Sequence, residues 1–394
     1  MIILGTRGHY CALGGVENSI RNLASVAVGQ AKPVTIVCRE AIKGEILGDP
    51  TKALPPEVNI VNYKDDAFSS MPSRLWHLSS GGKRLSKCFQ GLHFAHPSAE
   101  IIVRNHYHVL AASRAGFSNI RYLVPSLVIR QQKAEQEFAK LFDRIKLSFV
   151  MAIDSMMQKK AIEKSRVFVF SDTMAEQISN HMGVIPSEGH IDIVRPGVDD
   201  SRFKPAKKNE KISLRESLLL PLNKNLFLFV GRFVHAKGLI YAIEAMRFLP
   251  TDCVLVLVGD GEQKDMIRSK VKSLGVEDQI VFAESTLEVE NYYRACDVFV
   301  MSSTYEPLGQ TILEAAACGM PVVAFHRDSG AITATHELEI GVPLLFARQM
   351  NTHALAQSMR AALTCLNTFD VNTVASDIHK KYGWQRCLMN LLQK

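Results

Sequence analysis

The sequence lacks several features that would place it in an exported or membrane-spanning class. Its eight cysteines include no C-x-x-C pair, and several lie within apolar stretches. We therefore expect reduced core thiols of a cytoplasmic protein. No run of about eighteen apolar residues occurs, and the opening MIILGT has no basic, signal-like start. Neither export nor a membrane span is expected.

Motifs for nucleic-acid and metal binding are also missing. No RNP, zinc-finger or helix-turn-helix pattern is present, which argues against nucleic acid as a partner. The acidic pair Asp65 and Asp66 is adjacent rather than spaced as D-x-D, so it makes a poor pair of metal ligands.

Length and charge give the first positive indications. The chain has 394 residues, 47% of them hydrophobic and 22% charged, which suits a globular protein too long for one compact core. Residues 1–195 hold 24 Lys and Arg against 17 Asp and Glu, whereas residues 196–394 hold 22 of each. Such a basic half attracts anionic lipid or a phosphorylated acceptor, or it is simply a solvated surface.

Short apolar runs rich in β-branched residues alternate with helical patterns along the chain. This alternation predicts an α/β protein with doubly wound parallel sheets. The clearest expected strands are 1–4, 33–38, 58–63, 101–104, 167–170, 226–230, 254–259, 279–282, 297–301 and 322–324.

Residues 297–324 combine a strand, a polar loop, a helix from Leu308 and a second strand. Glu306 stands just before the expected helix, and Glu314 lies two turns into it, so both carboxylates can face one cleft. The N–H groups of 308–310 have no partner within the helix and, with the helix dipole, suit a phosphate. The alternative is that Glu306 is only a helix-start acid and Glu314 a solvated surface residue.

Three further loops carry candidate ligand-binding residues. Gly15, after the first strand, lets the backbone approach a ligand closely. His106 or His108 follows strand 101–104, at the carboxyl edge where open α/β sheets bind ligands. The alternative is a buried histidine that is hydrogen-bonded within the protein and has no role in ligand binding. Arg232 and Lys237 share the loop after strand 226–230, where two cations suit the phosphates of a nucleoside diphosphate unless they are ordinary surface charges.

Three stretches of the sequence resemble the signature of the retaining glycosyltransferases of family GT4. They are S-x-x-E-P-x-G-x-x-x-x-E-A-x-A-x-G-x-P-V-V over 303–323, G-R-x-x-x-x-K-G over 231–238, and IVRPGVDDSRFKP over 193–205. The resemblance implies the GT-B architecture, with two Rossmann-like domains facing a cleft. The implied acceptor-side domain is 1–195, joined by a C-terminal helix at about 376–394, and the nucleotide-sugar domain is 196–375.

The resemblance also implies roles for particular residues. Arg232 and Lys237 would bind the donor diphosphate, so that no metal or other cofactor is required, and Glu306 would position the sugar. Glu314 would hold the ribose, and His106 would be one of the catalytic residues. The remaining implied donor-binding residues are Gly15, Val281, Phe282, Leu308, Gly309 and Gln310. One departure is Leu123–Ser126, which stands where many GT4 proteins carry a further histidine.

The function implied is retaining transfer of a hexosyl or other glycosyl group (EC 2.4 class). The donor would be a nucleotide-diphosphate sugar and the acceptor a glycan or glycolipid of cell-surface polysaccharide or lipopolysaccharide biosynthesis. Basic and aromatic residues alternate over 65–98, which suits peripheral contact with the anionic inner face of a membrane or a helix packed on the sheet. An NDP-sugar epimerase and a non-enzymatic basic lipid-binding adaptor are the alternatives. The motifs do not encode the base, the sugar, the acceptor, the linkage or the oligomeric state.

Overall fold

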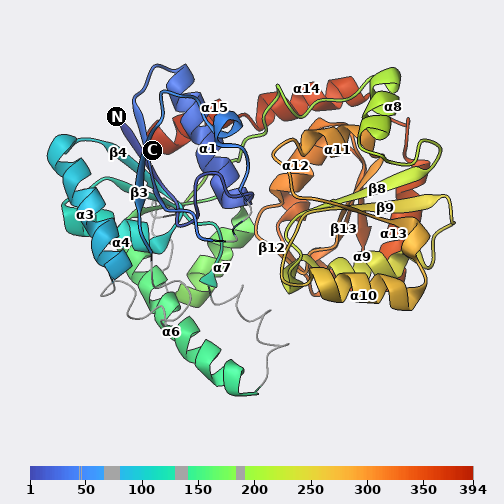
Figure 1. Ribbon diagram of the computed structural model, residues 1–394, viewed down its shortest axis with the longest axis horizontal. Helices are drawn as coiled ribbons and strands as arrows, with labels where there is room; N and C mark the ends of the chain where they lie inside the picture. The colour runs from blue at the N-terminus through green and yellow to red at the C-terminus, as the bar shows by residue number, and fades with distance from the viewer. Residues whose placement is uncertain (44, 46, 66–79, 129–140, 183–190, 394) are drawn as a thin grey trace. The chain divides into compact units, whose positions relative to one another are not determined.

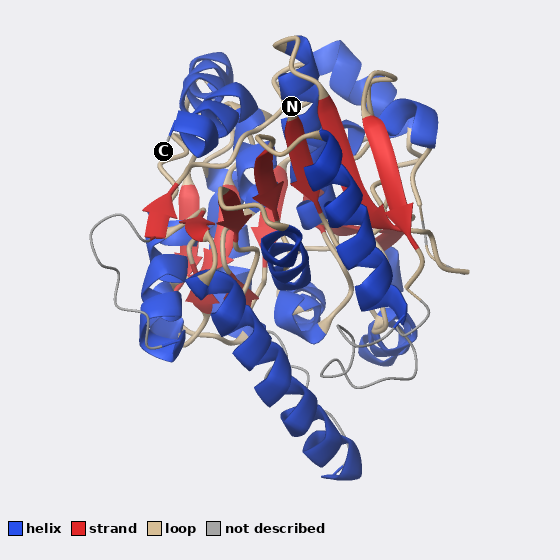
Figure 2. Ribbon diagram, turned by 90° about the vertical axis from the view of Figure 1, so that its left-hand side faces the viewer, coloured by secondary structure: helices blue, strands red, loops and turns tan. Residues whose placement is uncertain are grey.

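The computed structural model describes residues 1–43, 45, 47–65, 80–128, 141–182 and 191–393 (Figure 1). The chain forms two compact units. The first consists of Met1–Arg195 together with Trp384–Lys394, and the second of Pro196–Gly383. Each unit is built around its own parallel sheet with helices on its faces (Figure 2).

The first unit contains a sheet of seven strands within its described residues, in the order β3-β2-β1-β4-β5-β6-β7. Three of these strands, β1, β2 and β5, are buried along their whole length, as β2 shows with VTIVCR. Continuous apolar burial is expected for parallel strands that are covered on both faces. The strands are β1 (Ile2–Gly5), β2 (Val34–Arg39), β3 (Asn59–Tyr63), β4 (Glu100–Val103), β5 (Ile120–Leu123), β6 (Arg166–Val169) and β7 (Ile191–Ile193).

Helices of the first unit come from both ends of the chain. The terminal helix α15 (Trp384–Gln393) packs against α1 (Gly15–Gly29) and buries Trp384, Cys387, Leu388 and Leu391 (Figure 1). Arg121 of β5 donates to the backbone oxygen of Leu392 at 3.2 Å. The other helices are α2 (Pro50–Ala53), α3 (Ser80–Ala95), α4 (His106–Ala115), α6 (Leu141–Glu163) and α7 (Asp172–Met182).

The second unit has a parallel sheet of six described strands in the order β10-β9-β8-β11-β13-β15. Successive residues of β8 (Asn225–Val230) enter opposite cores: Leu226 and Leu228 belong to one cluster, Phe227 and Phe229 to the other. This alternation follows the two-residue period of a strand. The other strands are β9 (Cys253–Val258), β10 (Ile280–Ala283), β11 (Val298–Met301), β13 (Val322–Phe325) and β15 (Leu344–Ala347).

Helices and short elements complete the second unit. The short strands β12 (Tyr305–Glu306) and β14 (Ile332–Thr333) pair in parallel beside the main sheet. The α-helices are α8 (Lys208–Ser217), α9 (Leu239–Met246), α10 (Lys264–Leu274), α11 (Glu290–Ala295), α12 (Gln310–Ala317), α13 (Thr352–Thr364) and α14 (Val371–Lys381). The 3₁₀ turns are η2 (His235–Lys237), η3 (Glu277–Gln279), η4 (Arg327–Ser329) and η5 (Thr335–Glu337).

The expected class of two doubly wound α/β domains is confirmed, whereas two local boundaries differ. Residues 376–383 belong to the second unit, because Ile378 and Tyr382 are buried in its core. The helix expected from Leu308 begins at Gln310, because Gly309 adopts a left-handed conformation with φ of 84° and stands outside the helix. Residues 66–79, which carry part of the proposed membrane-contact segment, lie outside the described residues.

Candidate functional site

Two loops of the second unit meet where its strand order reverses. β8 lies between β9 and β11, so the loops that leave β8 and β11 emerge side by side at the carboxyl edge of the sheet. Crevices at such switch points are the usual ligand sites of open α/β sheets. The backbone N–H of Thr304 donates to the oxygen of Ala236 at 2.9 Å, and the Ser302 hydroxyl donates to the oxygen of Lys237 at 3.0 Å. These bonds fix the loop that carries Arg232 and Lys237 against the loop that carries Glu306.

Gly238 is essential to this close approach. Its φ of 58° lies in the left-handed region, and a Cβ added there would lie only 2.1 Å from the backbone oxygen of Ser302. Only glycine satisfies both conditions without displacing the backbone. The second glycine of the G-R-x-x-x-x-K-G pattern, Gly238, thus sets the distance between the two loops.

Lys237 and Glu306 form an ion pair between these loops. The Nζ atom of Lys237 contacts Oε2 of Glu306, and the Ser303 hydroxyl donates to the same oxygen at 3.4 Å. The other oxygen, Oε1, accepts from the backbone N–H of Gly309 at 3.2 Å. The Glu306 carboxylate therefore joins the loop after β8 to the start of α12. The N–H of Gly309, expected to be available to a phosphate, already has this partner.

Arg232 differs from Lys237 in its surroundings. It is exposed, and its guanidinium has no hydrogen-bond or ion-pair partner among the residues that the structure describes. An unengaged guanidinium offers a planar fork of donors to a phosphate group. The two cations of the loop are thus one fixed ammonium and one free guanidinium.

Glu314 is buried on α12 and uses different partners from Glu306. Its Oε2 accepts a hydrogen bond of 3.0 Å from the Tyr293 hydroxyl. Burial raises the pKa of the Glu314 carboxyl to about 7, although Tyr293, Arg202 and Gln310 act in the opposite direction. A buried carboxyl with a tuned pKa is characteristic of functional sites. The alternative of a solvated surface residue is therefore wrong, because only 5% of Glu314 is exposed.

The residues expected near the nucleobase lie on the edge strand β10. Val281 and Phe282 are both half-buried, and the Arg268 guanidinium lies 5.5 Å from the centre of the Phe282 ring. The N–H of Gly259, at the end of β9, donates to the oxygen of Ala283 at 3.4 Å. Strand β10 is separated from β8 by β9 alone, so its carboxyl end lies at the same edge as the cationic loop.

Gly15 of the first unit is the first residue of α1 and is exposed. A Cβ added to it would have no neighbour within 4 Å, whereas one on Gly14 would lie 2.5 Å from a carboxylate oxygen of Glu17. Glu17 also accepts from the Thr6 hydroxyl at 3.0 Å. A side chain at Gly14 would therefore require the flexible Glu17 carboxylate to shift, whereas open space lies beside Gly15.

The two candidate histidines of α4 occupy different environments. His108 is fully buried against the rings of Tyr63 and Phe89, at 5.8 and 6.0 Å between centroids, and burial lowers its pKa to about 3. It is a neutral core residue. His106 is also buried, but its Nε2 lies 3.9 Å from Asp154, which accepts a 2.5 Å bond from the Tyr107 hydroxyl. Of the pair, His106 is the one that lies beside a carboxylate.

Two partners of these residues escaped sequence reasoning: Asp154 and Tyr293. Each is distant in sequence from the group it contacts, or is an ordinary helical residue, so no spacing pattern marks it. Across the described ranges no group of three or more His, Cys, Asp or Glu residues could hold a metal ion. The same residues include no helix long and apolar enough to cross a membrane.

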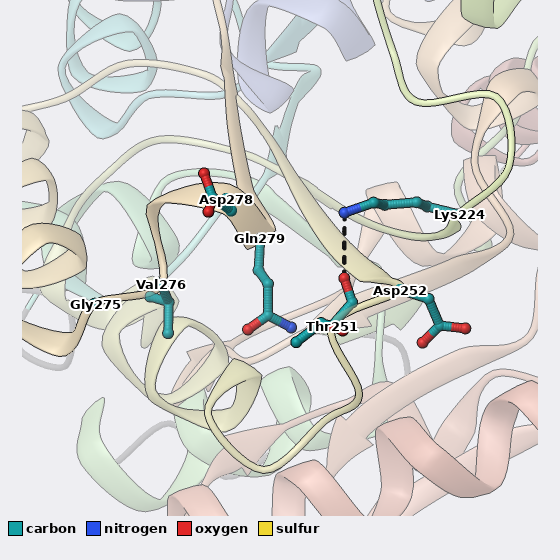
Figure 3. A pocket seen from close by; sticks show the side chains of 7 residues that line it. All are labelled: Lys224, Thr251, Asp252, Gly275, Val276, Asp278 and Gln279. Carbon is teal, nitrogen blue, oxygen red and sulfur yellow. Dashed lines mark hydrogen bonds between the residues drawn. The ribbon is translucent and has the colours of Figure 1, made fainter.

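A surface hollow of 410 Å³ lies at the opposite edge of the second sheet (Figure 3). Its residues precede β8, β9 and β10 or belong to the turns beside them. The Lys224 ammonium donates to the backbone oxygen of Thr251 at 3.2 Å across it. The residues that line it are Lys224, Thr251, Asp252, Gly275, Val276, Asp278 and Gln279. None of the residues predicted to bind a donor lies here.

The two doubly wound units define a protein of the GT-B structural class. Over the whole chain the fold matches sucrose-phosphate synthase from Thermosynechococcus elongatus, with a TM-score of 0.77, 19% identity, and coverage of 100% of this chain and 97% of that one. It also matches Anabaena Alr3699/HepE in complex with UDP and glucose, with a TM-score of 0.71, 17% identity, and coverage of 100% and 97%. Residues 210–368 match the model of the family described as "Glycosyl transferases group 1". The predicted kinship with glycosyltransferases is confirmed.

Curated relatives share parts of the chain. The uncharacterized glycosyltransferase MJ1607 of Methanocaldococcus jannaschii is 28% identical over 240 residues, which is 59% of this chain and 60% of that protein. The lipopolysaccharide core biosynthesis glycosyltransferase LpsE of Rhizobium meliloti is 42% identical over 114 residues, 29% of this chain and 33% of that protein. The matched segments thus span between one third and three fifths of these relatives.

Proposed function

We propose that this protein is a retaining glycosyltransferase. It moves a sugar from a nucleotide-diphosphate sugar to a glycan or glycolipid acceptor. The observation that carries the proposal is the pair of loops at the β8 and β11 carboxyl ends. These loops place free Arg232, fixed Lys237 and the Glu306 carboxylate at one switch point, beside the start of α12.

The proposed chemistry is electrostatic. As the bond between the anomeric carbon and the diphosphate oxygen breaks, negative charge grows on the diphosphate. Arg232 and Lys237 stabilise that charge, aided by the N-terminal dipole of α12. The acceptor oxygen bonds to the anomeric carbon on the face that the diphosphate leaves, and its proton passes to the departing phosphate. Glu306 positions the sugar, Glu314 holds the ribose, and no metal is needed.

The proposed acceptor is a glycolipid of lipopolysaccharide-core type. The name of LpsE, which shares 42% identity over 114 residues, supports this class. The excess of positive charge in residues 1–195 suits a phosphorylated acceptor. For the donor, the HepE complex with UDP and glucose makes UDP-sugars the first candidates.

A transfer assay tests the function. Purified protein is incubated with UDP-, GDP- and ADP-sugars, with and without lipopolysaccharide-type glycolipid acceptors, and release of the nucleoside diphosphate is measured. We expect acceptor-dependent release from one donor, lost in Glu306→Ala. Glu277→Ala is the matched control, because Glu277 is an exposed carboxylate of η3, at the opposite edge of the sheet. If no donor is bound or consumed, the alternative of a non-enzymatic basic lipid-binding adaptor is supported. If one stereocentre of the donor sugar is inverted without transfer, the alternative of an epimerase is supported.

We propose further that the protein sits on the inner face of a membrane. Helix α3 exposes Lys83, Lys87 and Phe94, and 92% of Phe94 is open to solvent. Their spacing places them along one face of the helix, and such a face suits anionic lipid. Flotation with phosphatidylglycerol vesicles should weaken in Phe94→Ser. It should be unchanged in Leu219→Ser, a residue that is 90% exposed in the second unit. Equal flotation of both variants contradicts this contact.

A further inference from the structure

Tyr293 has no role in the chemistry described so far, although it touches one of the proposed site residues. It lies on α11, is only 1% exposed, and directs its hydroxyl to Oε2 of Glu314 at 3.0 Å. A buried tyrosine hydroxyl needs a hydrogen-bond partner, and the partner here is the carboxylate assigned to the ribose.

The ring of Tyr293 packs against two other aromatic rings. It packs edge-on to Phe203 at 5.5 Å between centroids and tilted against Phe299 of β11 at 5.6 Å. A side chain held by two aromatic neighbours cannot turn its hydroxyl away without opening the core. The position of the hydroxyl, and with it the orientation of the Glu314 carboxylate, is therefore set by packing.

We propose that Tyr293 is a positioning residue for nucleotide binding: its hydroxyl orients the Glu314 carboxylate and favours its ionised form. The inference rests on the proposed function, in which Glu314 accepts hydrogen bonds from the ribose. An ionised carboxylate is an acceptor on both oxygens, whereas a protonated one presents a donor of its own. Oε2 accepts from Tyr293 and Gln310 also bonds the carboxyl, so the remaining acceptor capacity of the two oxygens is available to the ribose hydroxyls.

Charged and titratable groups around Glu314 shift the pKa of its carboxyl in both directions. Burial raises its pKa, as does Glu290 on α11, while Tyr293, Arg202 in the segment before α8, and Gln310 lower it. Arg202 is itself paired with Glu290 at 2.5 Å, so much of its charge is already compensated. Cys318, at the end of α12, is buried and its pKa is raised, so it is a neutral thiol near neutral pH. The Tyr293 hydroxyl is thus the donor whose hydrogen bond does most to favour the charged carboxylate, and Gln310 adds a smaller hydrogen-bond effect.

The test uses the isosteric variant Tyr293→Phe, which keeps the ring and removes the hydroxyl. Binding of UDP, GDP and ADP is measured by calorimetry from pH 6 to 9, together with the donor KM and kcat. We expect the Kd and the donor KM to rise about tenfold at pH 7.5, as for loss of a hydrogen bond to a charged group, with kcat within about twofold. The loss of affinity on acidification should begin at a higher pH than in the wild type, because the hydroxyl no longer favours ionisation.

Two comparisons keep the proposal falsifiable. Tyr292→Phe is the matched control, a half-buried neighbour on the same helix, and should bind as the wild type does. In a double-mutant cycle with Glu314→Gln, Tyr293→Phe should have no further effect, since the group through which it acts is gone. Additive effects, or an unchanged pH profile in Tyr293→Phe, overturn the inference. If the wild type itself binds none of the three nucleotides, the proposed function fails first.

Discussion

At the scale of single residues, the Lys237 ammonium has a carboxylate partner within the second unit itself. Glu306 fixes it from the loop after β11. The pair costs little extra ordering when a diphosphate binds, because the ammonium is already held at the loop junction. Such preorganised charges contribute most to catalysis when they meet charge that develops in the transition state.

Replacing Lys237 should therefore strongly lower the rate of sugar transfer and have only a small effect on the free energy of unfolding. In Lys237→Ala we expect kcat to fall about 10²–10³-fold, the usual effect of removing one preorganised electrostatic group. The assay is steady-state release of nucleoside diphosphate. Lys272→Ala, which removes an exposed lysine of α10, serves as the control and should retain full activity. Similar losses in both variants contradict a specific role for Lys237.

Glu314 should oppose folding above neutral pH. Its pKa rises from 4.5 to about 7 on folding, so between these values the folded protein binds more protons than the unfolded chain. The free energy of unfolding then falls as the pH rises through this window, and the full penalty remains above it. Glu314→Gln should raise the free energy of unfolding of the second unit at pH 8 by about 1–3 kcal/mol, with no gain at pH 4.

Urea unfolding at the two pH values checks this expectation. Glu277→Gln, at an exposed position, should show no pH-dependent gain. Loss of stability at pH 8 in Glu314→Gln would mean that the ionised carboxylate stabilises the fold. A gain in stability together with a loss of nucleotide affinity would identify Glu314 as a group kept for binding at the expense of stability.

At the scale of elements, the spacing of the two loops depends on Gly238. Gly238→Ala places a methyl group 2.1 Å from the Ser302 oxygen in addition to the left-handed strain. Gly275→Ala is a matched control, since Gly275 has a φ of 65° and open space around its Cβ position. We expect a loss of about 1–2 kcal/mol in Gly275→Ala and a clearly larger loss in Gly238→Ala, measured by denaturant unfolding. Equal losses would show that the loops separate easily.

Elements with continuous local patterns were predictable from the sequence. The β8 run NLFLFV and the β9 run CVLVLV have the apolar, β-branched or aromatic composition of strands covered on both faces. Gly319 and Pro321 follow the last residue of α12, Ala317, as is common after a helix ends. The beginning of that helix was harder, because it depends on a left-handed Gly309 whose N–H bonds to Glu306, a contact that propensity does not reveal.

The proximity of the candidate site residues was predictable where they share a loop or a short motif. Arg232, Lys237 and Glu306 occur in short spacings, and the structure brings the loops that carry them together. Tyr293 could not be foreseen, because its bond to Glu314 arises from the packing of α11 against α12. The burial of His108 against Tyr63 and Phe89 could not be foreseen either, because these two residues belong to other elements. Contacts between separate elements require the tertiary structure.

At the scale of the whole molecule, the first unit depends on residues from the end of the chain. Leu388 and Leu391 of α15 are fully buried. Truncating either to alanine should cost about 2–5 kcal/mol, whereas Met389→Ala, 45% exposed, should cost less than about 0.5 kcal/mol. Hydrogen exchange should show the loss in α1 and not in β9. Loss of protection in β9 alone would contradict the assignment of α15 to the first unit.

The place of α15 also determines the order in which the two units can be completed during synthesis. Protein domains are usually finished in the order in which they leave the ribosome. Here the second unit, Pro196–Gly383, has emerged entirely while the first still lacks Trp384–Lys394. The unit that is translated first must therefore wait, with α1 uncovered along the surface that α15 will occupy, until residues 384–394 have been synthesised.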